Sequence, residues 1–291
     1  MRLGLFTAAF PGRTLEQVAA WAADAGFEAL EIASWPGGHL DVESLDPDAV
    51  LGLLAGHRLE ISALAYYPNN LDPDDGAREA AHAHLRRVVD AAVRLGVGVV
   101  CTFAGADRWA PLGENLERFR RIWPPLVAYA EERGVRIAIE NCPMVFDLDR
   151  WPGGTNLAYC PAAWDVMFEA ISSPALGLNL DPSHLVWLQV DYERAVRDYG
   201  ERILHVHAKD TELSPDELYR RSTLSLGVGW QAARMPGRGE IDWARFVGAL
   251  RDVGYDGAVS VEHEDEEFEG SDEMVERGFL VARDTLRPLL D

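Results

Sequence analysis

The 291-residue sequence lacks the features that mark membrane, secreted and disulfide-stabilised proteins. It has no run of about 18 uncharged apolar residues, so no segment is predicted to cross a membrane. The opening residues, Met1–Phe6, become polar too soon for a signal peptide and predict a strand instead. The three cysteines are odd in number and form no CxxC pair, which argues against a disulfide framework and a zinc knuckle. We therefore expect a cytoplasmic, reducing location.

Positive charge is also scarce in this chain. Lysine and arginine together number 27, against 48 aspartates and glutamates, and the formal net charge is −21. The acidic residues are spread along the sequence, so the surface repels nucleic acid phosphates and anionic membranes. Neither nucleic acid nor a membrane is expected as a partner. Lys209 is the only lysine, which we interpret as a coding bias towards arginine.

Hydrophobic residues make up 48% of the chain, enough to bury a full core and to exclude wholesale disorder. Short aliphatic runs alternate with longer helical stretches, which is typical of a parallel sheet. The expected strands are 2–7, 27–33, 59–65, 97–103, 135–141, 175–181, 202–208 and 257–263. The expected helices are 14–25, 46–56, 76–95, 113–133, 161–171, 191–200, 242–253 and 272–287. Eight such units without a linker predict an α/β fold, a single-domain (β/α)8 TIM barrel over residues 1–291.

Local signals support these boundaries. Thr14 and Gln17 have the spacing of a capping box, and Gly26 ends the apolar stripe that follows them. The segments near 142–160 and 211–240 are longer than barrel connections need to be. Both follow strands, so we expect them on the face where barrel active sites form, either over a ligand or as simple surface insertions.

Four apolar strands end in an ionisable residue: Glu140, Asp181, His207 and Glu262. An isolated carboxylate at the rim of a packed barrel is costly to keep charged unless it is paired or bound to a metal. Three carboxylates and one imidazole suit Mn²⁺, Mg²⁺ or Co²⁺ better than a thiolate-seeking ion, and Zn²⁺ is kept as a further option. The pattern therefore predicts one divalent-metal site, with a ring of salt-bridged strand-end residues as the alternative.

Four motifs, in this order and spacing, resemble the xylose-isomerase-like TIM barrel superfamily. They are Ile139-Glu140-Asn141, Leu180-Asp181-Pro182-Ser183-His184, His205-Val206-His207-Ala208-Lys209-Asp210, and Ser260-Val261-Glu262-His263-Glu264-Asp265. The superfamily includes tagatose 3-epimerase-like enzymes, hydroxypyruvate isomerases, inosose dehydratase relatives and endonuclease IV. The resemblance covers almost the whole chain and implies an enzyme of the sugar phosphate isomerase/epimerase type. Members are often dimers or tetramers, so a homo-oligomer stays open.

The resemblance also implies roles for individual residues. Glu140, Asp181, His207 and Glu262 match the ligands of one divalent ion, with Mn²⁺ the first choice. Glu140 and Glu262 further match an acid/base pair: one removes a proton next to a carbonyl and the other returns it through an enediolate. His184 matches a histidine that touches substrate oxygens. The implied activity is metal-dependent isomerisation or epimerisation of a small carbohydrate, either a sugar or a sugar phosphate.

Other polar residues of the same motifs and loops have two interpretations each. Arg234 and Arg238, in the segment 211–240, bind substrate oxygens or a phosphate, or else are solvated. Glu31 and Glu264 line the site or form salt bridges at its rim. His205 lies one layer deeper than His207, which favours a structural role. Lys209 and Asp210 are expected to pair with each other beside the ligands.

Other functions are open at this point. A metal-dependent lyase or dehydratase acting on a keto-sugar or inosose is the main alternative, because the same enolising site can expel a β-leaving group. A nuclease of the endonuclease IV type is a minor alternative. It needs additional histidines after strands three and four, where this chain has Ala65-Tyr66 and Phe103-Ala104. A non-enzymatic sugar-binding barrel would be marked by a loss of metal binding.

Overall fold

The computed structural model describes residues 1–145, 154–225 and 228–290. Eight parallel strands close into a barrel in the order β1-β10-β7-β6-β5-β4-β3-β2. The barrel strands are β1 Arg2–Phe6, β2 Ala29–Ala33, β3 Glu60–Ala65, β4 Val99–Thr102, β5 Arg136–Glu140, β6 Leu176–Leu180, β7 Ile203–Ala208 and β10 Ala258–Val261. Each strand lies within its predicted range, and the predicted (β/α)8 barrel is confirmed. Among the described residues, no helix is long and apolar enough to cross a membrane.

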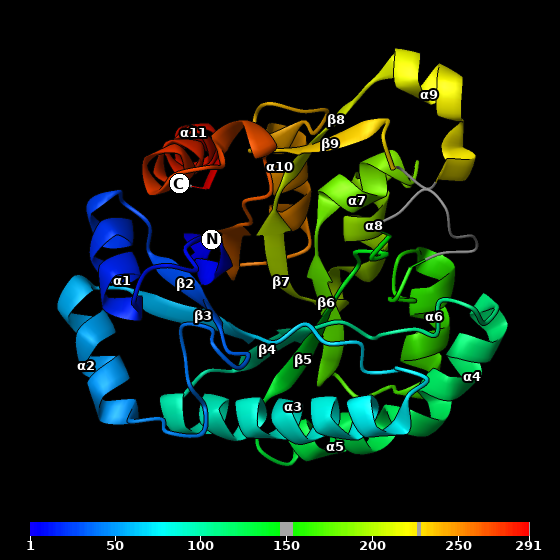
Figure 1. Cartoon of the computed structure of the whole chain (residues 1–291), viewed down its shortest axis with the longest axis horizontal. Helices are drawn as coiled ribbons and strands as arrows, with labels where there is room; N and C mark the ends of the chain where they lie inside the picture. The colour runs from blue at the N-terminus through cyan, green and yellow to red at the C-terminus, as the bar shows by residue number, and fades with distance from the viewer. Residues whose placement is uncertain (146–153, 226–227, 291) are drawn as a thin grey trace.

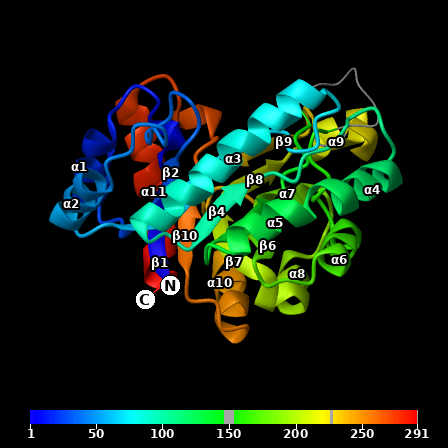
Figure 2. The ribbon, with the colours of Figure 1, turned by 90° about the horizontal axis from the view of Figure 1, so that it is seen from below.

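Helices surround the strands on the outside of the barrel (Figures 1 and 2). They are α1 Leu15–Asp24, α2 Pro47–His57, α3 Asp75–Leu95, α4 Leu112–Ile122, α5 Pro124–Glu131, α6 Pro161–Ala170, α7 Pro182–Trp187, α8 Tyr192–Tyr199, α9 Pro215–Arg221, α10 Trp243–Asp252 and α11 Asp272–Leu290. The predicted capping box forms: Thr14 Oγ1 accepts from the Gln17 amide at 3.3 Å, and the Gln17 side chain accepts from the Thr14 amide at 2.9 Å.

The helix predictions were incomplete in three places: one expected helix is divided, and neither α7 nor α9 was predicted. The single helix expected over 113–133 is divided into α4 and α5 at Trp123, because prolines follow at 124 and 125 and have no amide hydrogen to donate. The short helix α7, directly after β6, was not predicted. Its first turn is capped by Asp181, whose Oδ1 accepts from the Ser183 amide at 2.8 Å.

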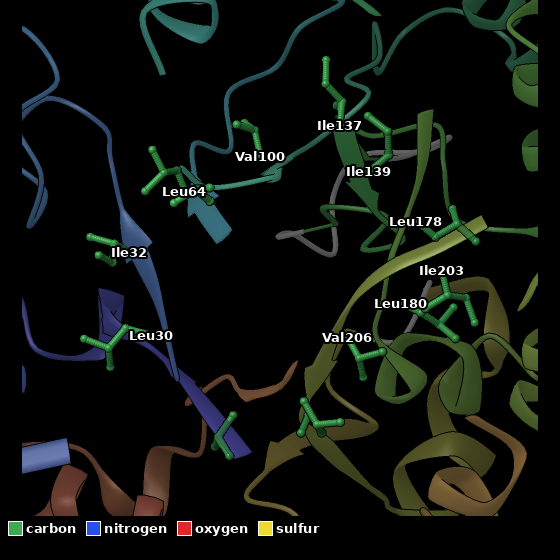
Figure 3. Packing of buried hydrophobic residues seen from close by; sticks show 14 of the residues in the cluster. Leu30, Ile32, Leu64, Val100, Ile137, Ile139, Leu178, Leu180, Ile203 and Val206 are labelled. Atoms are coloured by element: carbon green, nitrogen blue, oxygen red, sulfur yellow. The ribbon is translucent and has the colours of Figure 1, made fainter. Parts of the chain in front are cut away.

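The two faces of the barrel wall differ in character. Successive side chains of a strand point to opposite faces, and Figure 3 shows Leu30, Ile32, Ile137 and Leu178 pointing outward from the strands. These residues belong to the large buried hydrophobic cluster. The intervening positions point inward and include Glu31 of β2, which is fully buried. The barrel interior therefore holds polar side chains that the hydrophobic packing outside keeps away from water.

The long segment after β7 forms a hairpin rather than a loose loop. Strands β8 Asp210–Leu213 and β9 Gln231–Arg234 pair antiparallel, and α9 lies between them in the sequence, standing away from the barrel (Figure 1). The buried Asp210 carboxylate anchors the returning chain by accepting from the Gly237 amide at 3.0 Å and the Trp243 indole at 2.9 Å. Asp210 thus turns away from Lys209, and the expected pairing of these two residues is wrong. The other long segment, 142–160, includes residues 146–153, which lie outside the described residues.

Candidate metal centre

The four predicted ligands lie together at the carboxyl ends of β5, β6, β7 and β10. One ligand atom from each of Glu140, Asp181, His207 and Glu262 lies within 4.8 Å of the others, and all four residues are buried in the barrel mouth or nearly so. We call these four residues the metal cluster. Neighbouring parallel strands bring them to one level, which is why residues more than a hundred positions apart in sequence meet.

The orientation of Asp181 follows from its local structure. Its Oδ1 caps α7, and Asn141 at the end of β5 holds its backbone on both sides: Asn141 accepts from the Asp181 amide at 2.7 Å and donates to the Asp181 carbonyl at 2.9 Å. The remaining oxygen, Oδ2, is left facing the cluster. Asn141 belongs to a motif that the sequence singled out, but its contact with Asp181 required the neighbouring strand to be placed.

Three buried polar atoms at this point form no hydrogen bond, namely Asp181 Oδ2, His207 Nδ1 and His184 Nε2, although Asp181 Oδ2 has charged neighbours at 3.2 and 3.3 Å. Buried polar atoms are rarely left without a partner, because each one costs on the order of 1–3 kcal/mol. A divalent cation would accept the lone pairs of Asp181 Oδ2 and His207 Nδ1, and the carboxylates of Glu140 and Glu262 complete a set of oxygen and nitrogen donors. The residues present therefore fit such an ion.

Positive charge in the metal-free protein gathers at the same place. Lys209 Nζ lies 2.6 Å from Glu262 Oε2 and 3.2 Å from Asp181 Oδ2. Burial alone would lower the pKa of Lys209, but Glu262, Glu264 and Asp181 outweigh it and raise that pKa well above its ordinary value. Burial likewise opposes the charge on His207, yet the carboxylates of Glu31, Glu262 and Glu140 raise its pKa. The carboxylates of the metal cluster thus stabilise positive charge on neighbouring side chains even without a metal ion.

Lys209 is the residue that sequence reasoning missed most clearly. The sequence indicated a coding bias and a pairing with Asp210 beside the ligands, whereas the buried ammonium contacts Asp181 and Glu262 of the metal cluster directly. The available signal was spacing: Lys209 comes directly after β7 and two residues after His207, and side chains two apart along an extended chain share a face. Glu264 receives the same ammonium at 2.8 Å and also lines the cavity described next, so both interpretations of Glu264 hold.

A cavity of about 590 Å³ opens above the metal cluster. Its floor includes Glu140, Glu262 and Lys209, and its walls include the aromatic rings of Phe103 and Trp187. The hairpin strand β9 closes another side with Gln231–Arg234. The volume lies within the roughly 300–1,000 Å³ typical of small-molecule sites.

His184 faces this cavity from α7. The Trp187 indole donates to His184 Nδ1 at 3.4 Å, so in a neutral ring the hydrogen sits on Nε2. Nε2 lies 3.3 Å from Asp181 Oδ2 and 3.7 Å from Glu140 Oε1 without forming a hydrogen bond. The geometry makes His184 a donor directed at the space beside the metal cluster, where its predicted role places it.

The two predicted arginines are both bound to carboxylates. Arg234 lines the cavity, but its guanidinium pairs with Glu212 at 2.8 Å and Asp265 at 3.3 Å. Arg238 is not among the residues that line the cavity; it pairs with Asp265 at 3.1 Å and Glu267 at 2.7 Å. Buried Asp265 therefore ties both arginines to the turn after β10. The structure brings Arg234 to the cavity wall and leaves Arg238 behind it.

Below the metal cluster lies a second group of polar side chains, Ser62, Asn179, His205 and Ser260, which we call the lower polar layer. His205 Nδ1 meets Asn179 Oδ1 at 3.0 Å, and Nε2 meets the hydroxyls of Ser62 and Ser260, each at 3.2 Å. Burial lowers the pKa of His205 to about 4, so the ring is neutral. Both nitrogens are engaged, which favours the structural role expected for His205. Although Glu31, His205 and His207 are close enough to hold an ion, His205 has no free lone pair for it.

Comparison with known proteins places these observations in a family. The sequence model of the xylose isomerase-like TIM barrel family matches residues 19–285. The uncharacterized protein YfiH of Bacillus subtilis (strain 168) is 26% identical over 308 residues, covering 91% of this chain and 93% of that protein. An inosose dehydratase of Clostridium perfringens is 28% identical over 160 residues, which span 54% of this chain and 48% of that enzyme.

Solved structures show the same fold. An IOLI protein with a bound zinc atom matches with a TM-score of 0.76 at 19% identity, covering 100% of this chain and 98% of that one. A D-psicose 3-epimerase in the presence of D-fructose matches with a TM-score of 0.73 at 16% identity, covering 100% and 99%. At these identities the likeness concerns the fold. Together with the family match, it shows that the chain belongs to the xylose isomerase-like TIM barrel family.

Proposed function

We propose that the protein is a metal-dependent isomerase or epimerase of a small, uncharged sugar. The observation that carries the proposal is the pair Glu140 and Glu262, whose carboxylates share the metal cluster and line one cavity of sugar size. One divalent ion, with Mn²⁺ as first choice, would be held by the metal cluster and would polarise the substrate's oxygens so that the adjacent C–H becomes acidic.

The residues around the ion have separate tasks in this proposal. One of the two glutamates removes the proton from the carbon beside the carbonyl, and the other returns it to the neighbouring carbon or to the opposite face. His184 donates its Nε2 hydrogen to a substrate oxygen, since that atom has no partner in the protein. Trp187 and Phe103 exclude water from the reacting carbon.

The charge of the cavity supports an uncharged substrate. Its described lining includes five acidic residues, Glu140, Asp210, Glu262, Glu264 and Glu266, and two basic residues, Lys209 and Arg234. Both cations are already paired with carboxylates. A phosphate group would therefore meet five acidic side chains, while the lysine and the arginine of the described lining are already paired. Hydroxyls, in contrast, can exchange hydrogen bonds with carboxylates at little cost.

A dehydratase is the second candidate, and Lys209 is the observation that favours it. Loss of water from a keto-sugar or inosose requires an acid for the departing hydroxyl in addition to a base for the carbon-bound proton. The Lys209 ammonium lies beside Glu262, inside the proposed active site, and can supply that proton. The partial similarity to an inosose dehydratase supports the same candidate.

The nuclease alternative finds no support in the described site. Strand β3 ends at Ala65, and Phe103 follows the end of β4, so these two rim positions carry no histidine for additional metals. The strong negative charge opposes nucleic acid binding as well.

The test is turnover in D₂O by the Mn²⁺-loaded protein with neutral ketohexoses, inososes and their phosphate esters. We expect deuterium at the carbon next to the carbonyl, preference for the neutral compounds, and loss of activity after chelation. Product analysis separates the candidates, because a dehydratase product has lost one water. Single turnovers that carry the substrate's own deuterium to product with no solvent label would contradict proton transfer. Phosphate esters turned over in preference to neutral sugars would contradict the substrate class.

A further inference from the structure

Glu31, at the inward face of β2, makes a direct contact with the metal cluster from below. Its Oε2 accepts from His207 Nε2 at 2.7 Å, and both side chains are fully buried. Figure 3 shows why Glu31 reaches this point: its neighbours Leu30 and Ile32 point outward, so the residue between them points into the barrel. The contact joins residues 176 positions apart in the chain.

This contact decides which nitrogen of His207 faces the metal cluster. An ionised carboxylate only accepts hydrogen bonds, so the hydrogen between Glu31 and His207 belongs to Nε2. The remaining nitrogen, Nδ1, lies 3.5 Å from Glu140 Oε1 and 3.3 Å from Glu262 Oε2 and has no hydrogen bond. Glu31 therefore orients the ring so that Nδ1 is the atom presented to an ion.

The other oxygen of Glu31 is held as well. Tyr67 donates its hydroxyl to Glu31 Oε1 at 2.8 Å, and Asn179 in turn donates to the Tyr67 oxygen at 3.0 Å. Burial and the charge of Glu31 raise the pKa of Tyr67, which keeps this hydroxyl a donor. The carboxylate is thus fixed by one donor on each oxygen.

The charge of Glu31 has no conventional counterion. In the described part of the chain, no lysine or arginine forms an ion pair with it; its ionic contacts are with His207 and, at 3.7 Å, with His205. Both nitrogens of His205 are already engaged by neutral partners, Asn179 on one side and Ser62 and Ser260 on the other. A buried carboxylate without a compensating positive charge is costly. Within the described residues, His207 at 2.7 Å is therefore the partner through which Glu31 is linked to the metal cluster.

We propose that Glu31, supported by Tyr67, is a positioning residue that sets the affinity of the protein for its divalent ion through His207. The inference rests on the proposed metal site but not on the proposed reaction. Carboxylate partners of metal-binding histidines fix the ring and raise its basicity, and their loss typically weakens metal binding about 10–100-fold.

The test is the dissociation constant for Mn²⁺, measured by titration calorimetry on the metal-free protein without substrate. Glu31→Gln keeps the shape of the side chain and removes its charge, and we expect Mn²⁺ binding about 10–100-fold weaker. Tyr67→Phe removes the hydrogen bond to Glu31 and the one from Asn179 but leaves the charge of Glu31 in place, so it should weaken binding in the same direction by less. The Co²⁺-loaded protein provides a second readout, because its visible absorption bands should shift in Glu31→Gln if the ligand His207 has changed.

Ser62→Ala is the matched control. It removes a hydroxyl from the same barrel interior but touches His205 and Ser260 rather than His207, so Mn²⁺ affinity should stay at the wild-type value. If Glu31→Gln and Tyr67→Phe bind Mn²⁺ as tightly as wild type, the inference is overturned while the proposed function stands. If the wild-type protein binds no Mn²⁺, both are overturned. Weakening by Ser62→Ala equal to that of Glu31→Gln would also overturn it, since a general loss of packing would then explain both.

Discussion

His205 and His207 lie on the same strand and the same face, one layer apart, and yet their surroundings differ in kind. In the lower polar layer, both nitrogens of His205 meet neutral partners at ordinary hydrogen-bond distances. In the metal cluster, His207 meets three carboxylates and its Nδ1 has no hydrogen bond. A buried polar layer whose hydrogen bonds are all satisfied by its own side chains has a structural role. A layer with excess carboxylate charge and atoms without hydrogen bonds is suited to bind a cation.

The largest expected difference between the two layers is tested by replacing the acid/base carboxylates of the metal cluster with amides of the same shape. Glu140→Gln and Glu262→Gln retain an oxygen ligand but lose the acid/base group, so turnover at saturating Mn²⁺ should fall about 10²–10⁴-fold. Steady-state rates with the substrate found in the D₂O screen would measure the loss. If either variant kept more than about a tenth of the wild-type rate, that glutamate does not transfer the proton.

A paired substitution of the two histidines separates the layers directly. His207→Ala should weaken Mn²⁺ binding by more than the roughly 10–100-fold expected for an outer partner such as Glu31. His205→Ala should leave Mn²⁺ affinity near wild type but lower the free energy of unfolding by about 1–3 kcal/mol, because Asn179 loses its partner. Calorimetric titration and urea unfolding give the two quantities. If both variants weakened Mn²⁺ binding to a similar extent, the lower polar layer would not be purely structural.

The pH dependence of stability sharpens the same contrast. Burial lowers the pKa of His205 from 6.5 to about 4. Between these values the unfolded chain binds a proton that the folded protein does not, so stability is lost as the pH falls from 6.5 towards 4. The contribution is about 3 kcal/mol, at roughly 1.4 kcal/mol per pKa unit.

Urea unfolding with chelator present, at about pH 7 and about pH 4, would measure this contribution. The stability of wild type relative to His205→Ala should drop by about 3 kcal/mol across that interval. A difference that does not change with pH would mean that His205 is protonated in the folded protein, and the lower polar layer would then carry charge like the metal cluster.

Stabilisation by the ion itself is expected to be of similar size to the loss in His205→Ala. An ion that binds only the folded state adds about 2.7 kcal/mol to the free energy of unfolding at a concentration 100 times its dissociation constant. Thermal unfolding with and without Mn²⁺, together with elemental analysis, should show this stabilisation and one equivalent per chain. Three tightly bound zinc ions would contradict both the single site and the functional class.

The barrel and the meeting of its four strand-end residues were accessible from the sequence alone. Strand periodicity is a local property, so the apolar runs that end at Glu140, Asp181, His207 and Glu262 identify four of the strands. Eight consecutive βα units then predict a closed parallel barrel. The inward direction of Glu31 follows from the same periodicity, since it lies between Leu30 and Ile32. Strand periodicity thus predicts on which face of the barrel wall, and at what height along the barrel, each of these side chains lies.

The partners of the long side chains were decided only by the tertiary structure. Lys209 reaches Glu262, 53 residues away, and the guanidinium of Arg234, at the cavity wall, is paired with Asp265. Asp210 pairs with the returning hairpin rather than with its neighbour Lys209. The tip of a long flexible side chain goes wherever opposite charge is buried beside it, and that depends on segments brought together by folding. Sequence periodicity therefore determined where the metal cluster lies, and the packing of distant segments determined which charges compensate it.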